Sequence, residues 1–142
     1  MLSLKAGVFL WQEQYAESIA LATLALDGLP AGSRRWYMTF GTLHTAIAVS
    51  QPGALMNLAQ RFLDVLPSPE ARDEYLRAGA WLQPVLAIVG EKGIAHELLL
   101  RMRHEGVHLS KDDASAWGYL KAVEASHHHL IQEAPWVVHA GI

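Results

Sequence analysis

Hydrophobic residues recur along most of the chain at spacings of three and four positions, the period of a helix buried along one side. The clearest stripes consist of Leu55, Leu58, Ala59, Phe62 and Leu66, and of Ile94, Leu98 and Met102. No run alternates hydrophobic with polar residues between hairpin turns, as a β-strand would. The pattern therefore predicts an all-α protein.

Turn signals divide this helical pattern into hairpins. Prolines and glycines cluster at 29–33 and 66–69, and shorter breaks fall at 12–14, 51–53 and 90–93. We expect one domain over residues 1–142. It would hold helix–turn–helix hairpins at about 1–30, 32–67 and 69–106, a closing helix at about 111–132 and a tail at 133–142.

Local residues refine the ends of these helices. Ser33 is expected to cap a helix that starts at Arg34, and Ser68 to cap the next helix, with a proline at its first position. The run 110–113 resembles a capping box and should open the closing helix. Pro84 lies inside the first helix of the third hairpin, which it should kink or restart. The tail is expected to pack on the closing helix through Trp136.

Four glycines interrupt the helical segments at near-regular intervals. Gly7, Gly41, Gly79 and Gly118 are separated by 34, 38 and 39 residues. Glycine inside a helix costs about 1 kcal/mol relative to alanine, so its recurrence points to a recurring structural need. We expect each glycine to permit close contact between two helix backbones. Self-similarity at a period of this length is typical of stacked repeats.

Aromatic and small residues stand at fixed places around these glycines. Tyr37 and Tyr75 lie four positions before Gly41 and Gly79, whereas Ser3 stands at that place before Gly7. The second helix of the first hairpin carries Tyr15, Ser18, Ala25 and then Pro30. In these features residues 1–106 resemble a tetratricopeptide-type repeat array. The resemblance implies a superhelix of three stacked hairpins with a C-terminal capping helix.

Three short motifs carry a narrower resemblance. They are Gly-Ser-Arg-Arg-Trp-Tyr at 32–37, Ala-Trp-Gly-Tyr-Leu at 116–120 and Ala-Pro-Trp at 134–136. Together they look like the C-terminal helical region of large bacterial signalling proteins that join a serine/threonine kinase-like domain and an ATPase to such repeats. No glycine-rich phosphate loop followed by lysine occurs here, nor a kinase catalytic loop, so those activities do not carry over.

Composition narrows the classes of function. The chain has 142 residues and a formal net charge of −3, which argues against a general nucleic-acid-binding surface. Its longest apolar run, 85–89, is far shorter than the roughly 20 residues that span a bilayer. The absence of cysteine excludes thiolate zinc sites and fits a reducing compartment. We expect a cytoplasmic protein without a signal peptide, without a nucleic-acid or membrane partner and without a cofactor.

One motif suggests catalysis. The run His-Glu-Gly-Val-His at 104–108 satisfies the His-Glu-x-x-His pattern of zinc metallopeptidases, in which both histidines share one helix face and the glutamate activates water. Basic residues before Gly106 predict instead a helix end with that glycine in a left-handed cap. His108 would then lie beyond the helix, off the face of His104. A small zinc metallopeptidase that uses His104 and His108 is therefore kept only as a remote alternative hypothesis.

A histidine run also falls in the closing helix. His127, His128 and His129 are consecutive, so a helix points them in different directions and they cannot converge on one ion. His127 shares a stripe with Ala116, Leu120, Val123 and Leu130. We expect His127 to be buried with a hydrogen-bond partner and the other two to be exposed.

The expected function is non-catalytic protein binding or regulatory scaffolding. By analogy with the family, the first helices line a groove with the residues six and three before each glycine and one and four after it. These residues are Arg35, Met38, Thr42 and Thr45 in the second hairpin, and Asp73, Leu76, Ala80 and Gln83 in the third. The partner would be a protein or peptide, or a neighbouring domain of a larger polypeptide. Self-association into a homo-oligomer is the alternative. Most tryptophans are assigned to the core, with Trp11 or Trp136 as candidate exposed anchors.

Overall fold

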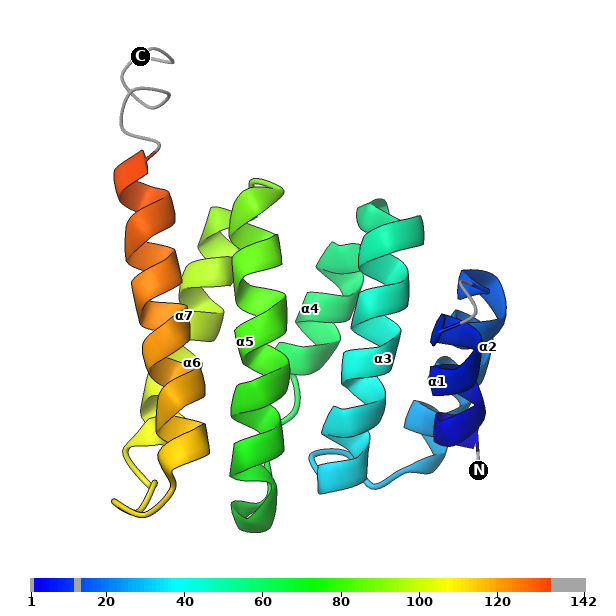
Figure 1. Cartoon of the computed structure of the whole chain (residues 1–142), viewed down its shortest axis with the longest axis horizontal. Coiled ribbons are helices and arrows are strands. Elements are labelled where there is room, and N and C mark those ends of the chain that lie inside the picture. The colour runs from blue at the N-terminus through cyan, green and yellow to red at the C-terminus, as the bar shows by residue number, and fades with distance from the viewer. Residues whose placement is uncertain (1, 12–13, 134–142) are drawn as a thin grey trace. The chain divides into compact units, whose positions relative to one another are not determined.

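The computed structural model describes residues 2–11 and 14–133, and every regular element within them is helical (Figure 1). The α-helices are α1 (Leu2–Trp11), α2 (Tyr15–Gly28), α3 (Arg34–Ser50), α4 (Leu55–Leu63), α5 (Arg72–Ile88), α6 (Lys92–Gly106) and α7 (Ala114–Glu133). Short 3₁₀ helices, η1 (Pro52–Ala54) and η2 (Pro69–Ala71), precede α4 and α5. The predicted all-α class is confirmed, and two α-helices lie within each predicted hairpin range. The predicted contact of Trp136 lies outside the described residues.

The chain forms two compact units, residues 1–78 and 79–142, and the boundary falls within α5. In the first unit α2 contacts both α1 and α3, and α4 contacts α3. In the second unit α6 contacts α7.

Aromatic rings fill the centre of the first unit. Phe40 from α3 lies 4.9 Å from Phe62 of α4, between ring centroids. The ring of Tyr75, from α5, stacks 5.1 Å from Phe62 and lies 5.4 Å from Tyr37, edge to face. Tyr37 and Tyr75 are the two aromatic residues that precede glycines at equal spacing, so the repeat positions of successive hairpins contact each other. Such aromatic pairs add about 0.5–1.5 kcal/mol beyond the area they bury.

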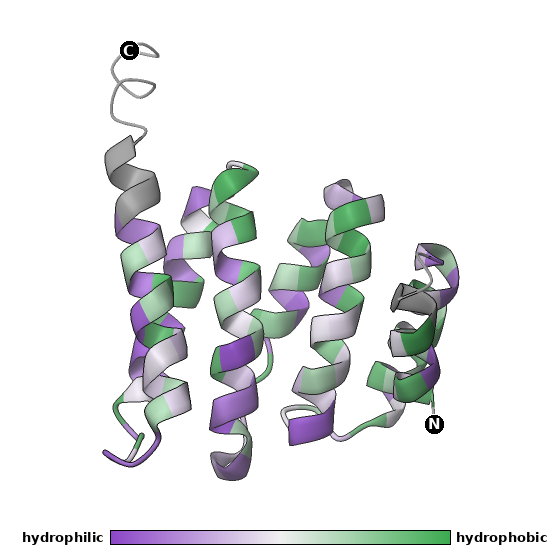
Figure 2. Ribbon diagram, viewed as in Figure 1, coloured by the Kyte–Doolittle hydropathy of each residue, from purple (hydrophilic) through white to green (hydrophobic). Residues whose placement is uncertain are grey.

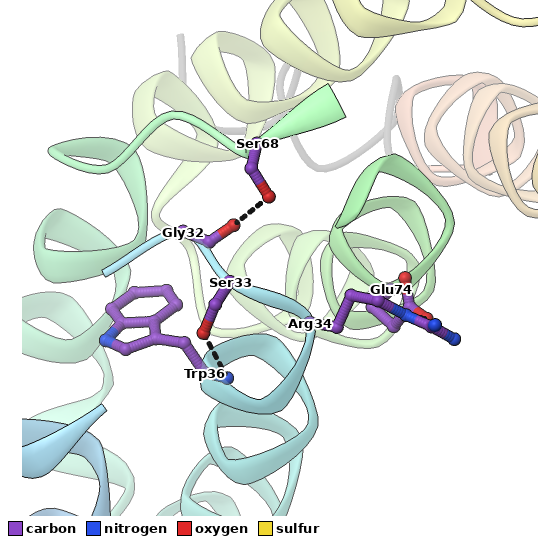
Figure 3. Close-up of polar contacts among 6 residues, drawn as sticks. All are labelled: Gly32, Ser33, Arg34, Trp36, Ser68 and Glu74. Carbon is purple, nitrogen blue, oxygen red and sulfur yellow. Dashed lines mark hydrogen bonds and ion pairs between the residues drawn. The ribbon is translucent and has the colours of Figure 1, made fainter. Parts of the chain in front are cut away.

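The start of α3 is fixed by two serines and one glycine (Figure 3). Ser33 Oγ accepts a hydrogen bond from the backbone N–H of Trp36 at 3.3 Å, which confirms the predicted cap. Ser68 does not cap its own helix; its hydroxyl donates instead to the Gly32 carbonyl at 3.2 Å. Gly32 has φ of +83°, and a Cβ there would collide with the Leu66 carbonyl. The loop before α3 and the loop before α5 are thereby held together.

The second unit has an aliphatic core. Its buried members are Leu82, Leu86, Ala95, Leu98, Leu99, Met102, Ala116, Leu120 and Val123. Leu98 and Met102 confirm the predicted stripe of α6, whereas Leu66 of the α4 stripe lies beyond its helix and is exposed. Pro84 does not restart α5, which is continuous from Arg72 to Ile88. Leu82 and Leu86, on either side of the proline, are held in the core, which favours one uninterrupted helix.

The common role assigned to the four glycines is wrong. All four lie inside helices, but a Cβ built at Gly7, Gly41 or Gly118 would meet nothing within 4 Å. Only Gly79 is crowded, and its neighbour is the side chain of Met102, whose Sδ would lie 2.8 Å from the new Cβ. Three of the four therefore bear the helix-propensity cost of glycine without a packing reason in the described structure.

Two helix ends also differ from expectation. Gly106 is the last residue of α6 but is not left-handed, since positive φ among the described glycines occurs at Gly32 and Gly90. Its missing side chain instead makes room for Leu120 Cδ2, 2.6 Å from where a Cβ would lie. The helix α7 begins at Ala114, later than the predicted 111, although Asp113 Oδ2 does accept the backbone N–H of Ser110 at 3.2 Å. That bond closes a turn before the helix rather than its first helical turn.

Candidate functional site

An open groove of about 710 Å³ lies between α1, α2 and α3 of the first unit. Its described lining residues are Leu2, Ser3 and Leu4 from α1, Leu24, Ala25 and Gly28 from α2, Leu29 after α2, and Arg35, Met38, Thr39 and Thr42 from α3. The volume lies within the range of about 300–1,000 Å³ that is typical of ligand pockets. The groove is therefore large enough for several side chains of a partner.

Helical spacing places the α3 residues along one wall of the groove. Arg35, Met38, Thr39 and Thr42 follow the i, i+3, i+4, i+7 pattern that puts residues on one face. Ser3 Oγ of α1 and Thr39 Oγ1 of α3 are hydrogen-bonded at 2.7 Å, which joins the two sides. Ser18 Oγ of α2 donates to the Ala6 carbonyl of α1 at 2.9 Å, in the buried interior. These two bonds tie α1 to both α2 and α3.

Several exposed hydrophobic side chains line the groove. Leu4 is 71% exposed, Met38 63% and Leu24 59%, although each lies beside other apolar side chains. Contiguous apolar surface on a soluble protein commonly marks an interaction site, whereas single exposed leucines need no explanation. This cluster could not be predicted from the sequence, because its members come from three separate helices.

One charged side chain, Arg35, is present among the described lining residues. Its neighbour Arg34 does not line the groove and donates through Nε to Glu74 Oε1 at 2.6 Å (Figure 3). The hydrophilic first turns of α3 and α5 in Figure 2 contain these charges. Asp27, at the end of α2, accepts from Arg61 at 2.6 Å. No ion pair joins Arg35 to any described residue.

The structure brings together three of the residues predicted to line a groove and separates the rest. Arg35, Met38 and Thr42 line the cavity. Thr45 is exposed on α3 outside the lining, with its hydroxyl bonded to the Gly41 carbonyl at 2.9 Å, and Asp73 is exposed at the start of α5. Leu76 and Gln83 are fully buried, at 0% exposure, so their assignment to a groove is wrong.

Gln83 is instead the polar centre of the second unit. Its Nε2 donates to the Ala95 carbonyl of α6 at 3.2 Å and lies 2.8 Å from Nδ1 of His127 in α7. An amide nitrogen that donates to both leaves Nδ1 as the acceptor, so His127 is neutral and carries its proton on Nε2. Burial first, and then the nearby His96 and Arg103, lower the pKa of His127. The prediction of a buried His127 with a hydrogen-bond partner is confirmed.

The His-Glu-x-x-His run straddles the end of α6. His108 lies beyond Gly106, as predicted, but the chain continues in a tightened turn in which the His108 N–H donates to the Glu105 carbonyl. The rings of His104 and His108 are therefore still 5.7 Å apart, and the expectation that His108 leaves the face of His104 is wrong. Glu105 is buried. In the part of the chain that the structure describes, no three His, Cys, Asp or Glu side chains are grouped so as to hold a metal ion.

His44 of α3 is a second buried histidine, which the sequence analysis did not single out. Its Nε2 is buried and accepts or donates no hydrogen bond within the described structure. Desolvation lowers the pKa of His44 from 6.5 to about 4, because a charged imidazolium would lose its hydration on burial. His44 is thus neutral at physiological pH and lines no described cavity.

Trp81 contradicts the assignment of tryptophans to the core. It is 67% exposed on α5, and Ile88, two turns further along the same helix, is 69% exposed. Trp36, by contrast, is buried as expected. The side chains of Trp11 and Trp136 lie outside the described ones.

Comparison with protein-family models, with curated proteins and with solved structures gave no match. Among the described helices, none has both the length and the apolar character needed to cross a membrane.

Proposed function

We propose that this chain is a non-catalytic protein-binding module whose binding site is the groove between α1, α2 and α3. The observation that carries the proposal is the meeting of Arg35, Met38 and Thr42, chosen by repeat position, with the exposed leucines of α1 and α2. Apolar walls with a few polar groups are what a helical or extended peptide segment requires. Met38 adds adaptability, because its unbranched thioether adjusts to differently shaped partners.

The wider setting is part of the same proposal. The three hairpins would stack as in tetratricopeptide repeats, in a cytoplasmic bacterial signalling protein whose enzymatic parts belong to other regions. In that setting the partner is a segment of another protein or a neighbouring domain of the same polypeptide. The contact between Tyr37 and Tyr75 supports a repeat relationship between the second and third hairpins.

Paired methionine variants test the groove. Met38→Lys places a charge in the groove. Met56→Lys places the same charge on α4, at another exposed methionine that does not line the groove. Peptides selected from a random display library on the wild-type chain should lose binding to Met38→Lys and keep it with Met56→Lys. Circular dichroism would establish that both variants keep their helical content. Selected peptides that bind both variants equally, or a library that yields none, would refute a binding function for this groove.

Self-association is the second candidate, and the exposed Trp81 and Ile88 favour it. Aromatic residues are enriched among the side chains that dominate protein interfaces. Light scattering over a range of concentrations should then show a mass increase that Trp81→Lys abolishes. A strict monomer at every concentration would exclude this alternative.

A further inference from the structure

Arg35 occupies a special place in the groove. Every other described lining residue is uncharged, so the guanidinium is the one full charge that a partner in the groove would meet. Ser3 and Thr39, two of the polar lining residues, are already hydrogen-bonded to each other. Thr42 adds one further hydroxyl to the lining, so Arg35 is the group through which a partner's charge would be recognised.

The surrounding charges leave Arg35 available. Arg34, the adjacent residue, is paired with Glu74, and Asp27 at the end of α2 is paired with Arg61. No described carboxylate lies within ion-pair distance of Arg35, although two acidic residues of the same unit are engaged by other arginines. Arg35 is itself exposed on α3, so its guanidinium is accessible to a partner in the groove. It would therefore favour a partner that supplies the missing negative charge.

We infer that the groove selects an apolar peptide segment that carries one acidic side chain, and that Arg35 is the residue that binds this acidic side chain. The inference rests on the proposed binding function and specifies its partner. A guanidinium binds a carboxylate through two parallel N–H···O bonds, which makes the preference geometric as well as electrostatic. A polyanion such as nucleic acid would instead require a row of cations, and the described lining offers one. Because the described lining holds one cation, it matches a single side-chain carboxylate better than an acidic residue at a chain terminus, where two carboxylates lie together.

A charge-reversal experiment on the full chain tests this. Random peptides are displayed with their C-termini fused to the display protein and are selected for binding to the wild-type chain. One selected peptide is then synthesised with a fluorophore and an amidated C-terminus. We expect an Asp or Glu at a fixed spacing from apolar residues. Its replacement by the amide should weaken binding to the wild type about tenfold, as fluorescence anisotropy measures. The same replacement should change binding to Arg35→Gln less than twofold, and Arg35→Glu should prefer a peptide with Lys at that position.

Arg34→Gln is the matched control, because it removes the adjacent arginine that is already paired with Glu74. It should keep the acidic preference in full. Peptides that bind Met56→Lys but not Met38→Lys, yet show no acidic preference or no dependence on Arg35, would overturn the inference and leave the groove's function standing. A requirement for a free C-terminal carboxylate would also overturn it. Failure to select any groove-dependent peptide would refute the proposed function itself.

Discussion

Gly79 and Gly118 belong to the same regular series and the same unit, but the structure predicts opposite effects of alanine. At Gly118 a Cβ meets nothing within 4 Å. Gly118→Ala should therefore recover the helix propensity that glycine forfeits, about 1 kcal/mol of unfolding free energy. At Gly79 the same substitution drives a Cβ to 2.8 Å from Met102 Sδ and 3.2 Å from its Cε.

The magnitude at Gly79 follows from the surroundings of Met102. A methionine side chain is flexible, but this one is completely buried, so its displacement would disturb the packed core of the second unit. Overpacking a core typically costs about 1–3 kcal/mol, which exceeds the propensity gain of about 1 kcal/mol. We expect Gly79→Ala to lower the unfolding free energy by about 1 kcal/mol and to differ from Gly118→Ala by about 2 kcal/mol.

Urea unfolding followed by circular dichroism measures both variants against the wild type. At constant m-value the midpoint should move upward for Gly118→Ala and downward for Gly79→Ala. The double variant Gly79→Ala with Met102→Ala removes the collision, so it should show no further loss from the Gly79 change. Equal stabilisation by both single substitutions would refute the reasoning, since it would mean that Met102 yields at no cost.

Two further substitutions test particular features of the first unit. Gly32→Ala should lower the unfolding free energy measured with urea by more than about 2 kcal/mol, because φ of +83° strains alanine and its Cβ collides with the Leu66 carbonyl. Gly53→Ala is the control and should change stability little, because its Cβ meets nothing within 4 Å. Equal effects of the two substitutions would contradict this account. The folded pKa of His44, about 4, lies below its ordinary value, so the stability it contributes is present above pH 6.5 and is lost as the pH falls toward 4. Between pH 7.5 and 5 the wild type should lose about 2 kcal/mol more unfolding free energy than His44→Phe, and equal losses would disprove the assignment.

Local signals in the sequence predicted most of the helical architecture. The cap at Ser33 depends only on a hydroxyl and an N–H three residues later, so the sequence contains all that it needs. The burial of His127 followed from the spacing of its apolar neighbours along one helix. Both predictions concern interactions within a helix or along one face, and period and capping determine these directly.

The predictions that failed depended on other segments. Ser68 has the same local setting as Ser33, yet its hydroxyl bonds to Gly32, which is remote in sequence. Gly79 and Gly118 have similar flanking residues, but only Gly79 faces a bulky side chain of another helix. The exposure of Trp81 could not be predicted for the same reason, since hydrophobicity alone does not tell which face of a helix lacks a neighbour.

The positions that the repeat pattern assigns to a groove have different surroundings in the two units. Gln83 occupies a position that the repeat pattern assigns to ligand contact, and there it contacts His127 of α7. The helix α7 thus supplies from within the chain the polar partner of Gln83, and its stripe of Ala116, Leu120 and Val123 is buried. The groove of the first unit presents exposed leucines, Met38 and one unpaired Arg35. An external segment built like α7, apolar along one side but with a carboxylate in place of the imidazole, has the chemistry to complete it.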